Sequence, residues 1–181
     1  MSVQLLTDLE KWYSKKDPWN YESSTEDNKR RKVLLSEIPQ RLYKNVLDIG
    51  CGHGFITRKL PGEHIIGVDI SKGAIKQAKK IKKDDNQRIN YLEGSIFDLL
   101  KIFNQDTKFD LIVITGVLYP QYIANSLNLT YLIIDKLLIS SGILISVHID
   151  EWYRASFPYF LIKEQFYSYL HYSHRLEIYQ K

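Results

Sequence analysis

The chain has 181 residues, of which 44% are hydrophobic and 25% are charged, and its formal net charge is +4. These values are ordinary for one globular domain, and so small a charge does not call for a nucleic-acid partner. The single cysteine, Cys51, and the lack of a secretory signal predict a cytoplasmic protein. We expect no membrane span, because no stretch approaches ~20 apolar residues, and no metal site, because the five histidines are scattered.

We expect residues 1–181 to fold as a single domain that begins with a helical cap over residues 1–42. Apolar residues recur at helical spacing between positions 3 and 13, which predicts a first helix with one apolar face. A second helix is predicted from about residue 24 to residue 35 or 37, with Ser24 as a weak N-cap.

From residue 44 the chain alternates between predicted strands and predicted helices. The strands are expected at about 44–49, 64–69, 89–93, 109–115 and 142–148. The helices are expected at about 53–60, 71–83, 97–103 and 121–139. Such alternation, with strands rich in Ile, Leu and Val, predicts an α/β fold with a Rossmann-like, doubly wound and mostly parallel sheet. A ligand is then expected beyond the carboxyl ends of the strands, beside the first strand.

The C-terminal segment, residues 151–181, is rich in aromatic residues. It is predicted to form a helix from about 159 to 170 and a last strand from 174 to 180. A single strand after residue 148 gives a sheet of six strands with a shortened C-terminal edge. Because an open edge can pair with a second copy of the chain, a homodimer is one expectation.

The most informative motif is the run 46–54, in which a buried-strand sequence reaches Asp48 and three glycines follow at every second position from Gly50. Glycine is needed where the backbone adopts conformations that a Cβ forbids and approaches a ligand closely. Asp69 ends the next predicted strand 69 − 50 = 19 residues later, close to the ~20 expected of a carboxylate that holds ribose hydroxyls. A dinucleotide site, with G-x-G-x-x-G, is disfavoured because position 55 is Phe55.

The pattern D-x-G-x-G-x-G followed by a strand ending in Asp resembles the class I S-adenosylmethionine-dependent methyltransferases over roughly residues 43–150. The resemblance implies S-adenosylmethionine as cofactor and S-adenosylhomocysteine as its product, with the glycine loop around the amino-acid part of the cofactor. It also implies that the Ser95 hydroxyl or the Ile96 amide reads the adenine, whereas Ser95 is alternatively a helix N-cap. The implied cofactor-binding residues are Asp48, Gly50, Cys51, Gly52, Gly54, Asp69, Ile70, Ser95, Ile96, Gly116 and Trp19.

A sharper resemblance lies in three short segments. Asp17-Pro18-Trp19, the basic run Lys29-Arg30-Arg31-Lys32 and Val117-Leu118-Tyr119 are similar to the nodulation protein S-like group of methyltransferases, whose members methylate amino sugars or related small acceptors. This resemblance implies that Trp19 and Tyr21 fold over the cofactor as a lid and that Arg30 or Arg31 meets the methionine carboxylate. Alternatively, Trp19 anchors the cap on the core and the basic run is a solvated helix face.

Methyl transfer requires in-line alignment of the acceptor and, at most, removal of one proton. His148, followed by Asp150 and Glu151, is a candidate base with an ordinary pKa of ~6.5. Alternation along the fifth strand also allows His148 to be a hydrogen-bonded structural histidine. Tyr119 is a second catalytic candidate, although such a residue more often serves in packing.

We expect the acceptor to be a small polar molecule, with a sugar or sugar nucleotide as the first candidate, methylated on oxygen or nitrogen. The stretch 115–120 lacks the Asn/Asp-Pro-Pro-Tyr-type motif of DNA and protein amide methyltransferases, which disfavours adenine in DNA as acceptor. The alternatives are another small metabolite, RNA, or a binding module that keeps the fold without turnover.

Overall fold

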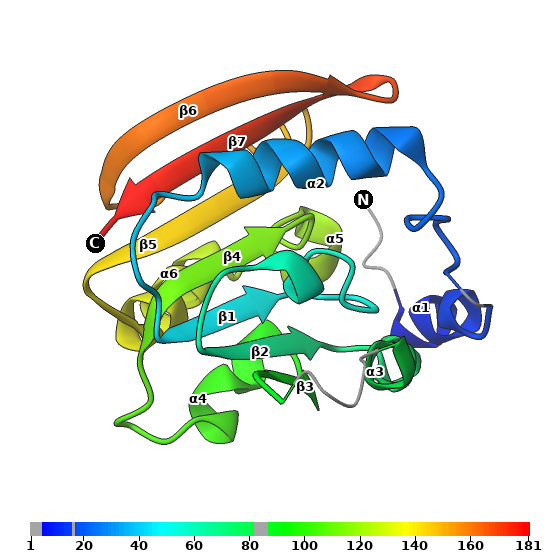
Figure 1. Ribbon diagram of the computed structural model, residues 1–181, viewed down its shortest axis with the longest axis horizontal. Helices are drawn as coiled ribbons and strands as arrows, with labels where there is room; N and C mark the ends of the chain where they lie inside the picture. Colours follow the sequence, from blue (N-terminus) through cyan, green and yellow to red (C-terminus); the bar gives the residue numbers. More distant parts are fainter. Residues whose placement is uncertain (1–4, 16, 82–86) are drawn as a thin grey trace.

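The computed structural model describes residues 5–15, 17–81 and 87–181. Its centre is a seven-stranded sheet with the strand order β3-β2-β1-β4-β5-β7-β6 (Figure 1). The first five strands run parallel and are β1 (Asn45–Ile49), β2 (His64–Asp69), β3 (Ile89–Glu93), β4 (Phe109–Thr115) and β5 (Leu138–Ile149). The predicted doubly wound, mostly parallel sheet is therefore confirmed, and only the start of β5 departs from its expected place by more than one residue.

Helices cover both faces of the sheet. One face carries α2 (Thr25–Glu37) and α3 (Lys72–Ile81), and the other carries α4 (Leu99–Ile102) and α6 (Leu127–Leu137). Residues 82 and 83, the expected end of the third helix, lie outside the described residues.

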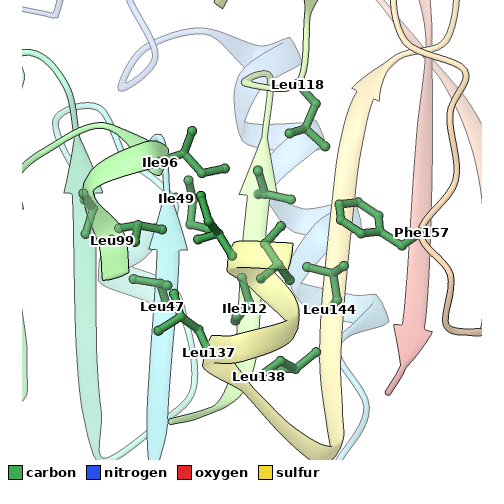
Figure 2. Close-up of a cluster of buried hydrophobic side chains, with 14 of the residues drawn as sticks. Leu47, Ile49, Ile96, Leu99, Ile112, Leu118, Leu137, Leu138, Leu144 and Phe157 are labelled. Carbon is green, nitrogen blue, oxygen red and sulfur yellow. The ribbon is translucent and has the colours of Figure 1, made fainter. Parts of the chain in front are cut away.

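The two faces bury two separate hydrophobic cores, because alternate side chains of each parallel strand point to opposite sides. Val46 packs toward α2 and α3, whereas the next residue, Leu47, packs toward α4 and α6. Figure 2 shows the second of these cores, in which Leu47, Ile112 and Leu144 from three strands meet Leu137 of α6. This packing fixes the level at which the strands end and therefore the position of the loops that follow them.

Three of the helices expected between residues 53 and 139 differ from those in the structure. The helix expected at 53–60 is a series of turns with one short 3-10 helix, η1 (Thr57–Lys59), because Gly54 adopts a positive φ of 83°. The helix expected at 97–103 is η2 (Ile96–Asp98) followed by α4. The helix expected at 121–139 divides into α5 (Pro120–Ile123) and α6, and β5 begins directly after it.

The N-terminal cap consists of α1 (Leu6–Tyr13) and α2, as expected. Ser24 is the N-cap of α2, since its hydroxyl accepts a hydrogen bond from the Asp27 amide at 3.1 Å. The α1 helix packs against α3, where the Glu10 carboxylate accepts a hydrogen bond from the Gly73 amide at 3.2 Å. The cap is thereby fixed beside the carboxyl end of β2.

The C-terminal segment corrects two predictions. The helix expected at 159–170 is a strand, β6 (Phe160–Tyr169), and it forms an antiparallel hairpin with β7 (Tyr172–Gln180). Because β7 also pairs with β5 along Ile143–Ile149, the sheet has its full seven strands and no shortened edge. The argument for a homodimer through a missing strand is therefore removed.

Candidate functional site

A cavity of about 380 Å³ lies at the carboxyl ends of the parallel strands. Its walls come from the glycine loop after β1, the ends of β2 and β3, the loop after β4 and the N-terminal cap. The cavity lining includes the following predicted cofactor residues: Trp19, Asp48, Gly50, Cys51, Gly52, Asp69, Ile70, Ser95, Ile96 and Gly116. The structure thus brings together the predicted set except for Gly54.

A side chain at each glycine of the loop would collide with a different part of the structure. Gly50 has a φ of 75°, and a Cβ there would collide with the side chain of Val117 from the loop after β4. Gly54, which does not line the cavity, has a φ of 83°, and its Cβ would collide with the Tyr91 hydroxyl from β3. Gly50 therefore allows two loops to meet at the cavity floor, whereas Gly54 allows the loop to pack on the sheet.

Asp48 lies at the floor of the cavity with an unsatisfied oxygen. Its Oδ2 accepts a hydrogen bond from the Thr57 hydroxyl at 2.6 Å, while its buried Oδ1 has no partner among the described residues. Burial raises the pKa of Asp48 to about 7. Since a buried polar atom without a partner is costly, Oδ1 is suited to accept a hydrogen bond from a ligand such as an ammonium group.

Asp69 at the end of β2 is held in place by two backbone amides. Its Oδ1 accepts a hydrogen bond from Ser71 at 2.9 Å and its Oδ2 accepts one from Gly52 at 2.8 Å. Burial raises the pKa of Asp69, and these two hydrogen bonds oppose the rise. Each carboxylate oxygen retains a second lone pair, so the oriented group can still accept hydrogen bonds from a pair of hydroxyls.

Arg30 from α2 is the one Lys or Arg side chain among the described residues that line the cavity. Its guanidinium lies near the rings of Tyr21 and Tyr169, at 5.3 and 5.4 Å, and it pairs with Asp27 at 3.3 Å. Its buried Nε has no partner among the described residues. The charge and the unsatisfied N–H make this side chain suited to a carboxylate ligand.

Arg31, the alternative to Arg30, points elsewhere. It donates hydrogen bonds to the Phe55 carbonyl at 3.1 Å and to the Asn28 side chain at 2.7 Å, and it does not line the cavity. Arg31 therefore fastens α2 to the glycine loop.

An aromatic stack forms the outer wall of the cavity. Trp19 is stacked between Trp12 and Tyr21, with ring centroids 6.1 and 5.9 Å away, and Tyr21 is stacked in turn on His53 at 5.7 Å. Trp19 and Tyr21 line the cavity, as does Tyr13, whose hydroxyl lies above the glycine loop. The cap is therefore placed as a lid over the site.

Sequence reasoning missed the contacts that fasten this lid. Glu22 forms an ion pair with Arg58 and meets His53 Nε2 at 3.3 Å, while Arg58 donates a hydrogen bond to the His53 carbonyl at 2.8 Å. Burial lowers the pKa of His53. The unusual His53 inside a glycine loop was the only signal in the sequence, because Glu22 and Arg58 are polar residues of ordinary appearance.

Ser95 is the helix N-cap that one interpretation predicted, and its place in the cavity lining is compatible with the other. Its hydroxyl accepts a hydrogen bond from the Phe97 amide at 3.2 Å and so caps η2, and the residue also lines the cavity beside Ile96. Cys51 is buried, and burial raises the pKa of its thiol, which is consistent with a packing role rather than a reactive one.

The two predicted catalytic residues lie behind the cavity wall. His148 is buried, its Nε2 accepts hydrogen bonds from the backbone amides of Val117 and Leu118, and burial lowers its pKa to about 3. Tyr119 accepts a hydrogen bond from the Ile149 amide at 2.9 Å, and burial raises its pKa to about 12. Neither residue lines the cavity, and the contacts of His148 are those of the hydrogen-bonded histidine that the structural alternative describes.

The two acidic side chains after β5 also form their contacts outside the cavity. Asp150 pairs with Arg175 at 3.4 Å, and Glu151 accepts a hydrogen bond from the Ser173 amide at 3.3 Å. These contacts tie the segment after β5 to β7. They leave neither carboxylate in the cavity.

A family model described as a methyltransferase domain matches residues 43–174. The chain belongs to this methyltransferase family. S-adenosylmethionine is the cofactor that this membership implies, and the unpartnered atoms of Asp48 and Arg30 fit its amino-acid end.

Curated relatives of this chain have different names. A putative protein N5-glutamine methyltransferase of Methanocaldococcus jannaschii is 34% identical over 97 residues, which cover 52% of this chain and 45% of the relative. Nodulation protein S of Sinorhizobium fredii is 27% identical over 106 residues, which cover 57% of this chain and 47% of the relative. The matched stretch therefore spans less than half the length of these curated relatives.

A solved structure matches nearly the whole chain. The N-methyltransferase NodS of Bradyrhizobium japonicum, in complex with S-adenosyl-l-homocysteine, superposes with a TM-score of 0.78 and 20% identity, covering 97% of both chains. This similarity confirms the class I methyltransferase fold, and with nodulation protein S among the relatives it confirms the resemblance to that group. Among the described residues of this chain, no helix has the length and apolar character needed to cross a membrane.

Proposed function

We propose that this methyltransferase binds S-adenosylmethionine in the cavity and transfers its methyl group to an oxygen or nitrogen of a small polar acceptor. The observation that carries the proposal is the arrangement of charge in the cavity: Asp48 at the floor, Asp69 at the end of β2 and Arg30 on the cap. These groups match the ammonium, ribose hydroxyls and carboxylate of the cofactor. The cofactor supplies an already activated methyl group.

The protein's part in the reaction is to bind, align and exclude water. Asp48 and Arg30 hold the two ends of an amino-acid group, and Asp69 holds the ribose, so the reacting sulfur is fixed between them. Trp19 and Tyr21 cover the site and reduce the access of water. No base from β5 is required in this scheme, in line with the buried and occupied His148.

A small acceptor is supported by the lid and by the loop after β4. The lid leaves half-exposed rings at the cavity, namely Trp19 with 37% and Tyr122 with 41% of its surface exposed, and such rings stack well on the apolar face of a sugar. The rival hypothesis of a scaffold without turnover drew its support from a missing last strand. The additional strand is present as β6, which completes the hairpin with β7, so the hypothesis loses this support.

The first test is calorimetric titration with S-adenosylmethionine and S-adenosylhomocysteine, with NAD as control. We expect micromolar binding of the first two ligands and none of NAD. An Asp69→Ala variant should lose about 2–4 kcal/mol of binding free energy, because charge-assisted hydrogen bonds to the ribose are removed. Glu93→Ala is the matched control, since Glu93 is an exposed acid at the end of the neighbouring strand and does not line the cavity.

Acceptor classes are separated in a second experiment, which follows methyl transfer to amino sugars, nucleotide sugars, glutamine-containing peptides and RNA in parallel. Turnover with a sugar supports the proposal. Turnover with peptide or RNA alone rejects the small acceptor while keeping the cofactor assignment, and unchanged binding in Asp69→Ala rejects the ribose role of Asp69.

A further inference from the structure

His148 connects the end of β5 to the loop after β4. Its Nε2 accepts hydrogen bonds from two consecutive backbone amides, those of Val117 at 3.3 Å and Leu118 at 3.1 Å. An imidazole nitrogen that accepts hydrogen bonds carries no proton, so the ring proton lies on Nδ1 and is donated to the Ser146 hydroxyl at 3.1 Å. Its neighbours thus select one tautomer of the neutral ring.

The connection between the two segments is reciprocal. The Tyr119 hydroxyl accepts a hydrogen bond from the Ile149 amide at 2.9 Å, so each segment supplies one side chain that accepts from the backbone of the other. The Tyr119 ring also meets the His148 ring edge-on, with centroids 5.4 Å apart. On another side, the Tyr153 ring lies 4.9 Å from His148 and closes the buried pocket that holds it.

The loop fastened in this way is part of the cavity wall. Gly116 and Val117 both line the cavity, and the Val117 side chain fills the space that a Cβ at Gly50 would occupy. The hydrogen bond from the Val117 amide to His148 therefore sets how closely this loop approaches the glycine loop. That approach determines the shape of the cavity beside Asp48, where the amino-acid end of the cofactor is proposed to lie.

We propose that His148 is a positioning residue, whose unprotonated Nε2 holds the loop Gly116–Leu118 against the glycine loop and so preserves the shape of the cofactor cavity. The inference rests on the proposed function, because it concerns the same cavity. This role excludes proton transfer by His148, because the one lone pair of its Nε2 already accepts hydrogen bonds from two backbone N–H groups.

The environment of His148 keeps the ring neutral. Burial is the main cause of its low pKa, and His174 and the positive charge of Arg175 lower it further. A protonated ring would place an N–H against the two amides of the loop and would break both hydrogen bonds. The low pKa thus maintains the hydrogen-bonding pattern on which the proposed role depends.

Two variants with side chains of similar size test this role. His148→Gln keeps a hydrogen-bond acceptor at the same number of bonds from Cβ as Nε2, whereas His148→Met fills the space without a comparable acceptor. We expect His148→Met to bind S-adenosylhomocysteine about tenfold more weakly in calorimetry, and His148→Gln to stay within about threefold of the wild type. Urea unfolding of both variants reports on stability separately.

A purely structural role predicts that both variants lose stability while, once folded, they bind S-adenosylhomocysteine as the wild type does. That result would overturn the proposal. Weaker binding by His148→Met with rescue by His148→Gln supports it, because a general loss of stability would not be rescued by an acceptor atom alone.

The ring itself is observed by ¹⁵N NMR of imidazole-labelled wild-type protein, which does not depend on a variant that folds. We expect His148 to show an unprotonated Nε2 and a protonated Nδ1 that do not titrate between about pH 5 and 8. A His148 ring that titrates near its ordinary pKa contradicts the assignment. If the wild type binds no S-adenosylhomocysteine, the proposed function fails, whereas this measurement still decides the tautomer.

Discussion

Asp48 illustrates how one residue can be unfavourable for folding and useful for binding. Its carboxyl group is buried, with one oxygen bound to Thr57 and the other without a partner among the described residues. Burial therefore favours the protonated form in the ligand-free protein and raises the pKa to about 7. A bound ammonium would favour the carboxylate and supply the missing donor.

A pH dependence of stability follows from this pKa. The pKa of Asp48 is higher in the folded protein than its ordinary value of 3.8, which applies to the unfolded chain. The folded protein therefore binds this proton more tightly, and the free energy of unfolding falls as pH rises from about 4 to about 7. An Asp48→Asn variant lacks the titrating group, and its free energy of unfolding should decrease less than that of the wild type between pH 5 and pH 7.5. Urea unfolding at both pH values measures the difference, and parallel pH profiles would contradict the assignment.

The places of Asp48 and Asp69 in the cavity are predictable from sequence, because strand, acid and glycine loop are adjacent in the chain and their relation is local. The role of His148 is not, because its partners, Val117 and Leu118, lie 31 and 30 positions away. Periodicity places His148 on a face of β5, but it does not show which loop packs on that face. Arg30 and Arg31 are likewise adjacent in sequence, and only the rotation of α2 separates the cavity residue from its neighbour.

At the level of elements, the lid is held to the glycine loop by few polar contacts. Glu22 is central, since it meets both Arg58 and His53. We expect Glu22→Gln to weaken S-adenosylhomocysteine binding by about twofold to fivefold, because a half-exposed ion pair contributes little but the lid must close over the ligand. Calorimetry of the variant measures the change.

Glu37→Gln is the matched control for the lid. It removes an ion pair with Lys163 at the other end of α2, away from the cavity. Equal binding by the Glu22 and Glu37 variants would show that the contact of Glu22 with the glycine loop has no part in retaining the ligand.

Elements buried on both faces were predicted best. Strands β1 to β4 have continuous apolar runs between clear turns, so their bounds agree with the expected ranges to within one residue. The β6 strand was mistaken for a helix because its solvent-facing side keeps apolar residues such as Phe160 and Phe166, which hide the alternation of a half-buried strand. Its pairing with β7 is a tertiary contact that a local window does not contain.

For the molecule as a whole, the C-terminal hairpin reaches back to the N-terminal cap. The Tyr169 hydroxyl, at the end of β6, donates a hydrogen bond of 2.7 Å to Asp27 of α2, and Asp27 in turn pairs with Arg30. The C-terminal hairpin and α2 thus meet beside Arg30, the cation that lines the cavity, which links completion of the sheet to the geometry of the site (Figure 1).

A Tyr169→Phe variant tests this link. It removes one hydroxyl that orients Asp27, so we expect about fivefold weaker binding of S-adenosylhomocysteine with a small change in the free energy of unfolding. Tyr172→Phe in the same hairpin is the control, because the Tyr172 ring packs on Trp152 and not on α2. Unaltered affinity in Tyr169→Phe, measured by calorimetry, would mean that Arg30 keeps its position without the hairpin.

The uneven placement of the three tryptophans has an optical consequence. Trp12 and Trp19 stack in the lid, and Trp19 lines the cavity with 37% of its surface exposed, whereas Trp152 lies against Tyr119 and Tyr172. A ligand that fills the cavity replaces water around the Trp19 indole, which shifts fluorescence emission to shorter wavelength. The Trp19 indole therefore reports by its fluorescence whether the cavity is occupied. Binding of ligands to the wild type and its variants can be titrated in this way without a label.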